Sequence, residues 1–383
     1  MIGICIKYFH ENYGGMLQAY ATIKLLEKYK VTYEIIRYEK KKDFKFIVQS
    51  IPRIFNPILI NDKYEAFQKK LSFKGHPEFK KNDSVRMQAF DKFRKEKFSN
   101  KLSNVYYGYE NLKDGAKKYD AVLTGSDQLW SPAGLPTNFY NLMFVPDNIR
   151  KISYASSFGV KYIPWYQKNR TKEFLNRIEF ISMRENTGKD IVKKLTGRDV
   201  PVVLDPVFMF NKREWKELIP IEKLYNEKYI FAYFLGANTD YRKAVEELAQ
   251  KKGLKIVTLR HLDQYVEYDE KFGDYAPYDV APNQFLNILR DAEYVCTDSF
   301  HGAVFSIIHE KKFIVFNRYD EASKHSKNSR IDSLCENFGL SDRRYHGNIE
   351  NIADKEIDYA RVKETYDKLK NKSEKYIEEA LSL

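Results

Sequence analysis

Residues Tyr294–Phe305, with the sequence YVCTDSFHGAVF, decide the fold of this 383-residue chain. A short apolar run ends at Asp298 and Ser299, and an apolar, helix-like segment begins after His301 and Gly302. This order is typical of a strand that leads into a helix in an open α/β sheet. Such sheets bind ligands beyond the carboxyl ends of their strands, where helix N-termini present free N–H groups to anions. We therefore expect these four residues to meet an anionic ligand.

The same alternation runs through most of the chain. Apolar runs bounded by turn residues predict strands, and apolar residues repeated every three or four positions predict helices. The expected strands are 2–8, 33–38, 120–125, 152–156, 180–183, 202–204, 229–235, 255–259, 294–297 and 313–316. The expected helices are 16–28, 173–177, 241–252, 282–290, 302–309, 331–338 and a charged helix from about 355 onward. This pattern predicts two α/β, Rossmann-like domains with parallel sheets that face a cleft.

The pattern also sets the expected domain boundaries. The N-terminal domain should cover residues 1–210, with a basic helical insertion at about 39–118 on its flank. A polar stretch from residue 211 crosses to a C-terminal domain that ends near residue 355. Residues 356–383 form a closing helix.

Composition excludes several classes of protein. The formal net charge is +12, but no zinc finger, recognition helix or RNA-binding signature accompanies the lysines, so we expect no nucleic-acid partner. The three cysteines are widely spaced in apolar surroundings and predict reduced core thiols. The chain opens on a strand-like run and not on a signal peptide, which predicts a cytoplasmic protein. Lysines between residues 40 and 118 suggest peripheral contact with the anionic inner face of a membrane.

The absence of known motifs argues against nucleotide, zinc and serine-nucleophile chemistry. The P-loop, the dinucleotide fingerprint, the HExxH zinc motif and the serine elbow are absent from the sequence. The seven histidines are scattered singly, whereas a metal site needs clustered ligands. We therefore expect no metal and no bound cofactor.

Two strand-end loops of the N-terminal domain carry side chains suited to sugar hydroxyls. One precedes the first helix, and the other follows the strand 120–125 and includes Trp130. A helix cap with a tight turn explains the first loop equally well, and a structural loop around a packed tryptophan explains the second. The candidate sugar-binding residues are Asn12, Tyr13, Gly14, Gln18, Ser126, Asp127 and Gln128.

Two further positions could act on an anion. Arg184 follows the strand 180–183 and offers a planar fork of donors for a carboxylate or a phosphate, although a salt bridge between domains is an equal alternative. His301 stands between a strand and a helix, beside Asp298 and Ser299. Because the imidazole pKa lies near neutrality, a histidine at this place is a candidate general acid.

Together these segments resemble the polysaccharide pyruvyl transferase family. The resemblance covers the chain from its first residues to about residue 340. It rests on seven motifs in order: NYGGMLQAYA at 12–21, GSDQLW at 125–130, ISYASSFG at 152–159, SMRE at 182–185, VLDPV at 203–207, TDSFHG at 297–302 and NSRI at 328–331.

The resemblance implies a GT-B-like fold whose closing helix packs back on the first domain. It also implies transfer of the enolpyruvyl group of phosphoenolpyruvate to a sugar of a cell-surface polysaccharide or its lipid-linked precursor, with release of phosphate. Phosphoenolpyruvate is then a co-substrate, and no metal is required. In this family an arginine of the S-x-R-E element and a histidine after a strand handle the donor, and these match Arg184 and His301. His301 becomes the expected acid that protonates C3 of the enol, with Asp298 orienting it.

The chain departs from the family at one position. Some members carry an arginine two residues before the histidine, where this chain has Ser299. If that arginine binds the phosphate, another cation replaces it here, and Arg330, Arg318 and Lys327 are the candidates.

Two other functions fit the same predicted fold. A nucleotide-sugar-dependent GT-B glycosyltransferase would usually carry a carboxylate in the late loops of the second domain to bind the ribose, and none is evident near Asn317. A non-catalytic glycan- or anion-binding module would be stabilised by a ligand that it never consumes.

Overall fold

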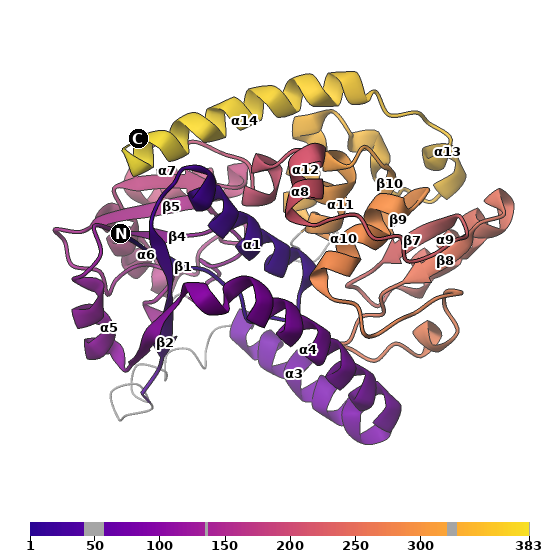
Figure 1. The fold of residues 1–383 in the computed structure, drawn as a ribbon, viewed down its shortest axis with the longest axis horizontal. Coiled ribbons are helices and arrows are strands. Elements are labelled where there is room, and N and C mark those ends of the chain that lie inside the picture. The colour runs from indigo at the N-terminus through magenta and orange to yellow at the C-terminus, as the bar shows by residue number, and fades with distance from the viewer. Residues whose placement is uncertain (42–56, 135–136, 320–327, 383) are drawn as a thin grey trace.

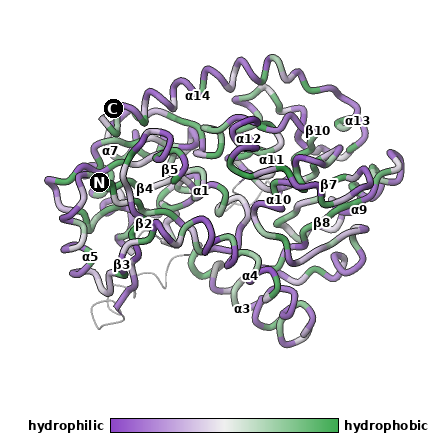
Figure 2. The backbone as a smooth tube through the Cα atoms, viewed as in Figure 1, coloured by the Kyte–Doolittle hydropathy of each residue, from purple (hydrophilic) through white to green (hydrophobic). Residues whose placement is uncertain are grey.

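Two α/β units lie side by side, and a long C-terminal helix spans both of them (Figure 1). The computed structural model describes residues 1–41, 57–134, 137–319 and 328–382. Residues 42–56 of the expected basic insertion and Lys327 fall outside these ranges. The central strands are mostly hydrophobic, whereas the C-terminal helix is largely hydrophilic (Figure 2).

The first unit is a six-stranded parallel sheet in the order β3-β2-β1-β4-β5-β6. This order reverses between β1 and β4, which is where doubly wound sheets bind ligands. The strands are β1 (Ile2–Cys5), β2 (Tyr33–Glu39), β3 (Leu102–Tyr107), β4 (Ala121–Thr124), β5 (Arg150–Ser156) and β6 (Phe180–Met183). The helices are α1 (Tyr13–Lys28), α3 (Pro57–Gly75), α4 (Pro77–Phe98), α5 (Tyr109–Ala116), α6 (Lys168–Arg177) and α7 (Asn186–Thr196).

The second unit is a four-stranded parallel sheet in the order β10-β9-β7-β8, which reverses between β7 and β9. Its strands are β7 (Tyr229–Tyr233), β8 (Lys255–Thr258), β9 (Tyr294–Thr297) and β10 (Lys312–Val315). Its helices are α9 (Thr239–Lys252), α10 (Pro282–Asp291), α11 (Phe300–Ile308), α12 (Ser329–Phe338) and α13 (Ile349–Ala353). The predicted α/β class with parallel sheets is confirmed.

Two helices connect the units. Helix α8 (Lys212–Leu218) lies in the predicted crossing, where the Asn211 side chain and Glu214 form a capping box. Helix α14 (Tyr359–Leu381) returns across the first unit, where the Tyr376 hydroxyl donates to the Ser153 carbonyl at 2.8 Å. The Ser373 hydroxyl accepts the Leu204 backbone N–H at 2.9 Å.

Three predictions about secondary structure need correction. Residues 202–204 form no regular strand. Val202 makes an isolated bridge to Met183, and the Val203 N–H donates to the Met183 carbonyl at 2.9 Å, but the Leu204 N–H already donates to Ser373 of α14. The insertion at 39–118 is more than helical, since it also supplies edge strand β3. Helix α11 begins at Phe300, two residues earlier than predicted, because the Ser299 side chain caps it.

All three cysteines are buried and unpaired, as predicted. Within the described ranges, none of the helices is both long and apolar enough to span a bilayer.

Candidate active site

Asp205 is the buried centre of a polar cluster that joins the two units. Its Oδ1 accepts the backbone N–H of Val207 at 3.2 Å and so caps the short turn that follows. Its Oδ2 accepts hydrogen bonds from Ser126 Oγ at 2.8 Å and Arg184 Nη1 at 3.0 Å. The same oxygen lies 3.7 Å from His301 Nε2. One carboxylate therefore holds side chains that follow β4, β6 and β9.

Three carboxylates surround the Arg184 guanidinium, whose side chain is 2% exposed. Asp205 lies 3.0 Å away, Asp127 3.6 Å and Glu185 3.7 Å. Burial lowers the pKa of Arg184, but these carboxylates outweigh it and raise the pKa. Burial likewise raises the pKa of Asp205, and His301 and Arg184 reverse the effect and lower it. Arg184 and Asp205 are therefore both ionised at neutral pH and attract each other.

Arg184 keeps two donors that make no hydrogen bond to the described part of the chain, although each lies within ion-pair distance of a carboxylate. Among the described residues, Arg184 Nε and Nη2 make no hydrogen bond, and the same is true of His301 Nε2 and Arg330 Nε. Buried donors without partners are rare in folded proteins and indicate a place for a ligand or for water.

Two arginine side chains lie over the ring of Phe300. The guanidinium carbon of Arg184 lies 4.6 Å from the ring centroid, and that of Arg330 lies 5.8 Å from it. Burial, and after it the charge of Arg184, lowers the pKa of Arg330 to about 10. Of the two candidate replacements for the family arginine that the structure describes, Arg330 is thus the one beside Arg184. Arg318 instead lies near Gly236, whose backbone N–H donates to Asp298.

The free space beside this cluster is small. A cavity of about 40 Å³ is bounded in part by Arg184, Asp205, Phe300 and Arg330, which is room for roughly one to three water molecules. A ligand larger than that would need the side chains or the two units around the cavity to move apart.

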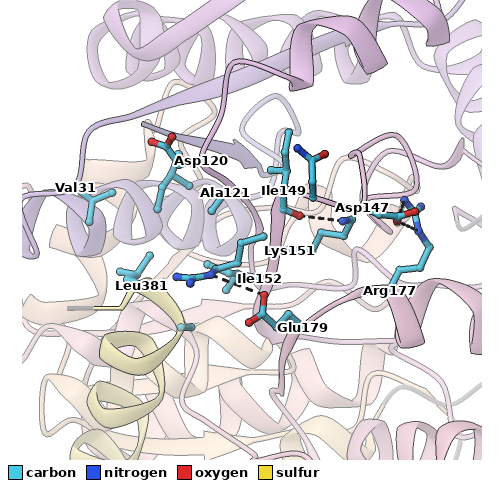
Figure 3. A pocket seen from close by; sticks show the side chains of 14 residues that line it. Val31, Asp120, Ala121, Asp147, Ile149, Lys151, Ile152, Arg177, Glu179 and Leu381 are labelled. Atoms are coloured by element: carbon cyan, nitrogen blue, oxygen red, sulfur yellow. Dashed lines mark hydrogen bonds and ion pairs between the residues drawn. The ribbon is translucent and has the colours of Figure 1, made fainter.

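A larger cavity, of about 590 Å³, lies at the other end of the first sheet, beside the N-terminal ends of β1, β4, β5 and β6 (Figure 3). Its charged groups already pair with one another, since Arg177 lies 2.8 Å from Asp147 and Arg150 3.8 Å from Glu179. We therefore assign the candidate active site to the smaller cavity, where the donors lack partners.

His301 lies in the first turn of α11 and packs against the first unit. A Cβ atom built on Gly14 would lie 2.4 Å from the Cβ, Cγ and Nδ1 atoms of His301. Only glycine therefore lets α1 approach the imidazole this closely. The predicted loop at Asn12–Gly15 does meet the predicted histidine, through Gly14.

Asp298 does not take the expected place beside His301. Its two oxygens accept the backbone N–H groups of Leu235 at 2.7 Å and Gly236 at 2.8 Å. It thus ties together the loops after β7 and β9, and burial raises its pKa. The carboxylate beside the imidazole is Asp205, so the expected pairing of Asp298 with His301 is corrected.

Several other predicted residues have structural contacts. Asn12 caps α1 through the Gly15 N–H, and Gln18 donates to Thr22 Oγ1 within the same helix. The Tyr13 hydroxyl donates to the Val280 carbonyl at 3.0 Å, which links the two units. Trp130 is fully buried and donates to the Tyr140 carbonyl, so it is packed and offers no exposed face to a sugar.

Of the four remaining predicted residues, two lie at the candidate site and two have structural roles. Asp127 lies beside Arg184 with a left-handed backbone (φ +73°), and Gln128 Nε2 lies without a hydrogen-bond partner among the described residues. Ser299 accepts the Gly302 N–H at 3.3 Å as the cap of α11. A Cβ on Gly302 would lie 2.7 Å from Thr297 Oγ1, so its glycine permits close packing of helix on strand.

Sequence reasoning missed Asp205, Phe300 and Glu185 as site residues. Asp205 was visible only as the aspartate of the VLDPV motif at 203–207. Phe300 and Glu185 are direct neighbours of His301 and Arg184 in the sequence, and this adjacency was the available signal.

Residues 12–320 match the polysaccharide pyruvyl transferase family, a span that includes Asp127, Arg184, Asp205 and His301. The chain belongs to this family. The predicted membership is thus confirmed, and the protein is a transferase. Arg330 lies just beyond the matched span. No curated protein sequence matches this chain significantly.

The predicted GT-B-like fold is supported by the first of three similar solved structures, whose TM-score is 0.50. UDP-N-acetylglucosamine 2-epimerase from Rickettsia bellii has 9% sequence identity and a TM-score of 0.50, covering 100% of this chain and 95% of that one. UDP-GlcNAc 2-epimerase from Neisseria meningitidis, bound to UDP-GlcNAc, has 12% identity, a TM-score of 0.48 and coverage of 100% and 99%. The ADP-heptose LPS heptosyltransferase II of E. coli has 11% identity, a TM-score of 0.33 and coverage of 97% and 99%. At such low identity the likeness concerns the fold alone.

Proposed function

We propose that this transferase moves the enolpyruvyl group of phosphoenolpyruvate onto two hydroxyls of a sugar, forms a cyclic ketal and releases phosphate. The acceptor is a sugar of a cell-surface polysaccharide or of its lipid-linked precursor. The observation that carries the proposal is the pair Arg184 and Arg330 over the Phe300 ring, next to His301 and Asp205.

The two arginines suit an anion with two charged ends. Among the described residues, Arg184 Nε and Nη2 make no hydrogen bond, and neither does Arg330 Nε. Burial lowers the pKa of Arg330 to about 10, so its charge is held where charge is costly. A phosphate or carboxylate bound there would relieve that cost. Phosphoenolpyruvate has one group of each kind.

His301 supplies the proton in the proposed reaction. The buried Asp205 carboxylate lies 3.7 Å from Nε2, so a negative charge faces the imidazole. A sugar hydroxyl attacks C2 of the enol while His301 protonates C3, which becomes a methyl group. A second hydroxyl then bonds to C2 as the C2–O bond to phosphate breaks. Of the two hydroxyl protons, one restores His301 and the other leaves with the phosphate.

The acceptor is proposed to approach from the first unit. Asn12 is exposed, and the Asp127 side chain is 26% exposed beside Arg184. Its ionised carboxylate can accept a hydrogen bond from a sugar hydroxyl.

The test measures phosphate release from phosphoenolpyruvate in the presence of candidate diol sugars, with the ketal product identified by mass spectrometry. His301→Ala should lower the rate by roughly 10²-fold or more, since general acid catalysis contributes about that much. His346→Ala is the matched control, because His346 is exposed and lies outside the site. Wild-type turnover in His301→Ala would remove its assigned role.

Thermal shift separates the competing functions. Phosphoenolpyruvate should raise the Tm of the wild type, and Arg330→Ala should abolish the shift, whereas Arg213→Ala, with a side chain 89% exposed, should keep it. Stabilisation by nucleotide sugars and not by phosphoenolpyruvate would favour a glycosyltransferase. Stabilisation by phosphoenolpyruvate without turnover of any acceptor would favour a binding module.

A further inference from the structure

Helices α3 and α4 form a hairpin that projects from the body of the molecule (Figure 1). The hairpin is held at the junction of the two units through α4. Phe90 lies 4.7 Å from the Tyr13 ring, and Arg86 donates to the Arg260 carbonyl of the second unit at 2.5 Å. The inner residues of α4 are buried, so α3 is the outer helix.

Helix α3 carries an apolar stripe that no described residue covers. Ile60, Tyr64, Phe67 and Leu71 are 55%, 59%, 57% and 44% exposed. Their spacing of four, three and four residues places all four within an arc of about 60° on a helix of 3.6 residues per turn. Scattered exposed apolar side chains are ordinary, but four in line along one helix face mark a surface of interaction.

A row of lysines borders the stripe. Lys63, Lys70 and Lys74 are all exposed, and helical geometry places them on one side of the stripe, within about 90° of its centre line. The fourth lysine of α3, Lys69, points the other way and forms a 2.9 Å ion pair with Asp83 of α4. The hairpin as a whole has eleven lysines and arginines against six aspartates and glutamates.

An anionic lipid surface fits this combination. A helix with an apolar face and flanking lysines lies in the membrane interface, with apolar side chains below the headgroups and ammonium groups among the phosphates. Each lysine near an anionic surface strengthens binding by roughly fivefold. A polar protein partner would leave the apolar stripe uncovered, whereas a neutral apolar one would leave the lysines unpaired.

A second copy of the chain fits less well. Four half-exposed side chains offer on the order of 400 Å², about half of the ~800 Å² per partner that a stable interface buries. Two such stripes in contact would also bring their lysine rows together.

We propose that the stripe Ile60–Tyr64–Phe67–Leu71, with Lys63, Lys70 and Lys74, docks this enzyme on anionic membrane. The surface is a defined face of one helix and not the general positive charge of residues 40–118. It lies on the hairpin whose Phe90 contacts Tyr13, the residue before Gly14 at the candidate active site. Docking would therefore bring that site close to the lipid surface, and it does not depend on the proposed reaction.

The test is flotation of the full-length protein with vesicles of phosphatidylcholine alone or with phosphatidylglycerol added. The wild type should bind only the anionic vesicles. Lys63→Glu/Lys70→Glu/Lys74→Glu should lower the partition coefficient by roughly 100-fold or more. Tyr64→Ser/Phe67→Ser should lower it by roughly tenfold or more. The matched controls are Lys193→Glu/Lys194→Glu on α7 and Tyr162→Ser/Trp165→Ser, all exposed positions of the first unit, which should bind as the wild type does.

A second measurement reports the depth of the stripe. Phe67→Trp, in a Trp165→Phe background that removes the 82% exposed tryptophan, should show a blue shift of its emission with anionic vesicles only. Equal binding to both kinds of vesicle, or undiminished binding by the folded serine variant, would overturn the proposal. So would a dimer in light scattering that this serine variant converts to a monomer, because the stripe would then be a subunit interface.

Discussion

The Oδ2 atom of Asp205 lies 3.7 Å from Nε2 of His301, and the two residues come from different α/β units. The same atom accepts the Arg184 hydrogen bond at 3.0 Å. The junction of the two units is thus built around one ionised carboxylate. Its neighbours are an imidazole and a guanidinium, and both lower the pKa of Asp205 against the effect of burial.

Asp205→Asn should destabilise the protein and nearly abolish activity. The amide keeps the shape of the side chain but leaves the buried Arg184 with one carboxylate fewer, and breaking a buried pair costs about 3 kcal/mol. The free energy of unfolding from urea titration measures the first effect, and phosphate release measures the second. The control Asp114→Asn removes an exposed carboxylate paired with Lys117 and should change neither.

Asp127→Asn should show a loss of stability that depends on pH. Burial raises the pKa of Asp127, but Arg184 chiefly reverses this and holds it well below its usual range. The stabilising contribution is therefore complete above the unfolded pKa of about 3.9 and is lost as pH falls toward the folded value. The difference in Tm between wild type and variant should be constant near neutral pH. It should shrink toward zero below about pH 4. A difference that persists unchanged in acid would contradict the ion pair.

Gly14→Ala and Gly15→Ala should differ sharply although they are neighbours in α1. A methyl group at Gly14 would lie 2.4 Å from His301, so helix or imidazole must move. We expect a loss of about 1–3 kcal/mol together with lower kcat. At Gly15 the nearest atom is 3.5 Å away, and alanine should be neutral or stabilise the helix by up to about 1 kcal/mol. Similar effects of both variants in urea titration would argue against the close approach.

The sequence predicted an element best where its local residue pattern agrees with its burial in the folded protein. Strand β9 has the predicted bounds of 294–297, because its four residues are buried and polar residues follow them directly. Strand β3 escaped prediction because it is an edge strand of mixed exposure within a lysine-rich region. The start of α11 was misplaced because Ser299 looked like a ligand residue and is a helix cap.

At the candidate site, the sequence predicted individual residues but not which of them meet. Arg184 and His301 were found because each follows a strand, and the carboxyl ends of parallel strands face the ligand side of a sheet. The identity of the carboxylate beside His301 could not be found in this way. Asp205 and Asp298 both follow apolar runs, and only the packing of one sheet against the other decides which of them meets the imidazole.

Asp298→Asn separates these two carboxylates by experiment. Both oxygens of Asp298 accept backbone N–H groups, and an amide can replace only one of them, so we expect a loss of about 1–2 kcal/mol. Burial raises the pKa of Asp298, so its stabilising contribution is complete below the unfolded value of about 3.9 and decreases as pH rises through the folded value. The difference in Tm between wild type and variant should therefore narrow with rising pH, opposite to Asp127→Asn.

The activity of the two variants should differ as well. Because Asp298 does not hold His301, the kcat of Asp298→Asn should stay within about tenfold of the wild type with an unchanged pH profile, whereas Asp205→Asn should lose roughly 10²-fold or more. A loss of kcat in Asp298→Asn as large as that in His301→Ala would show that Asp298 orients the imidazole after all.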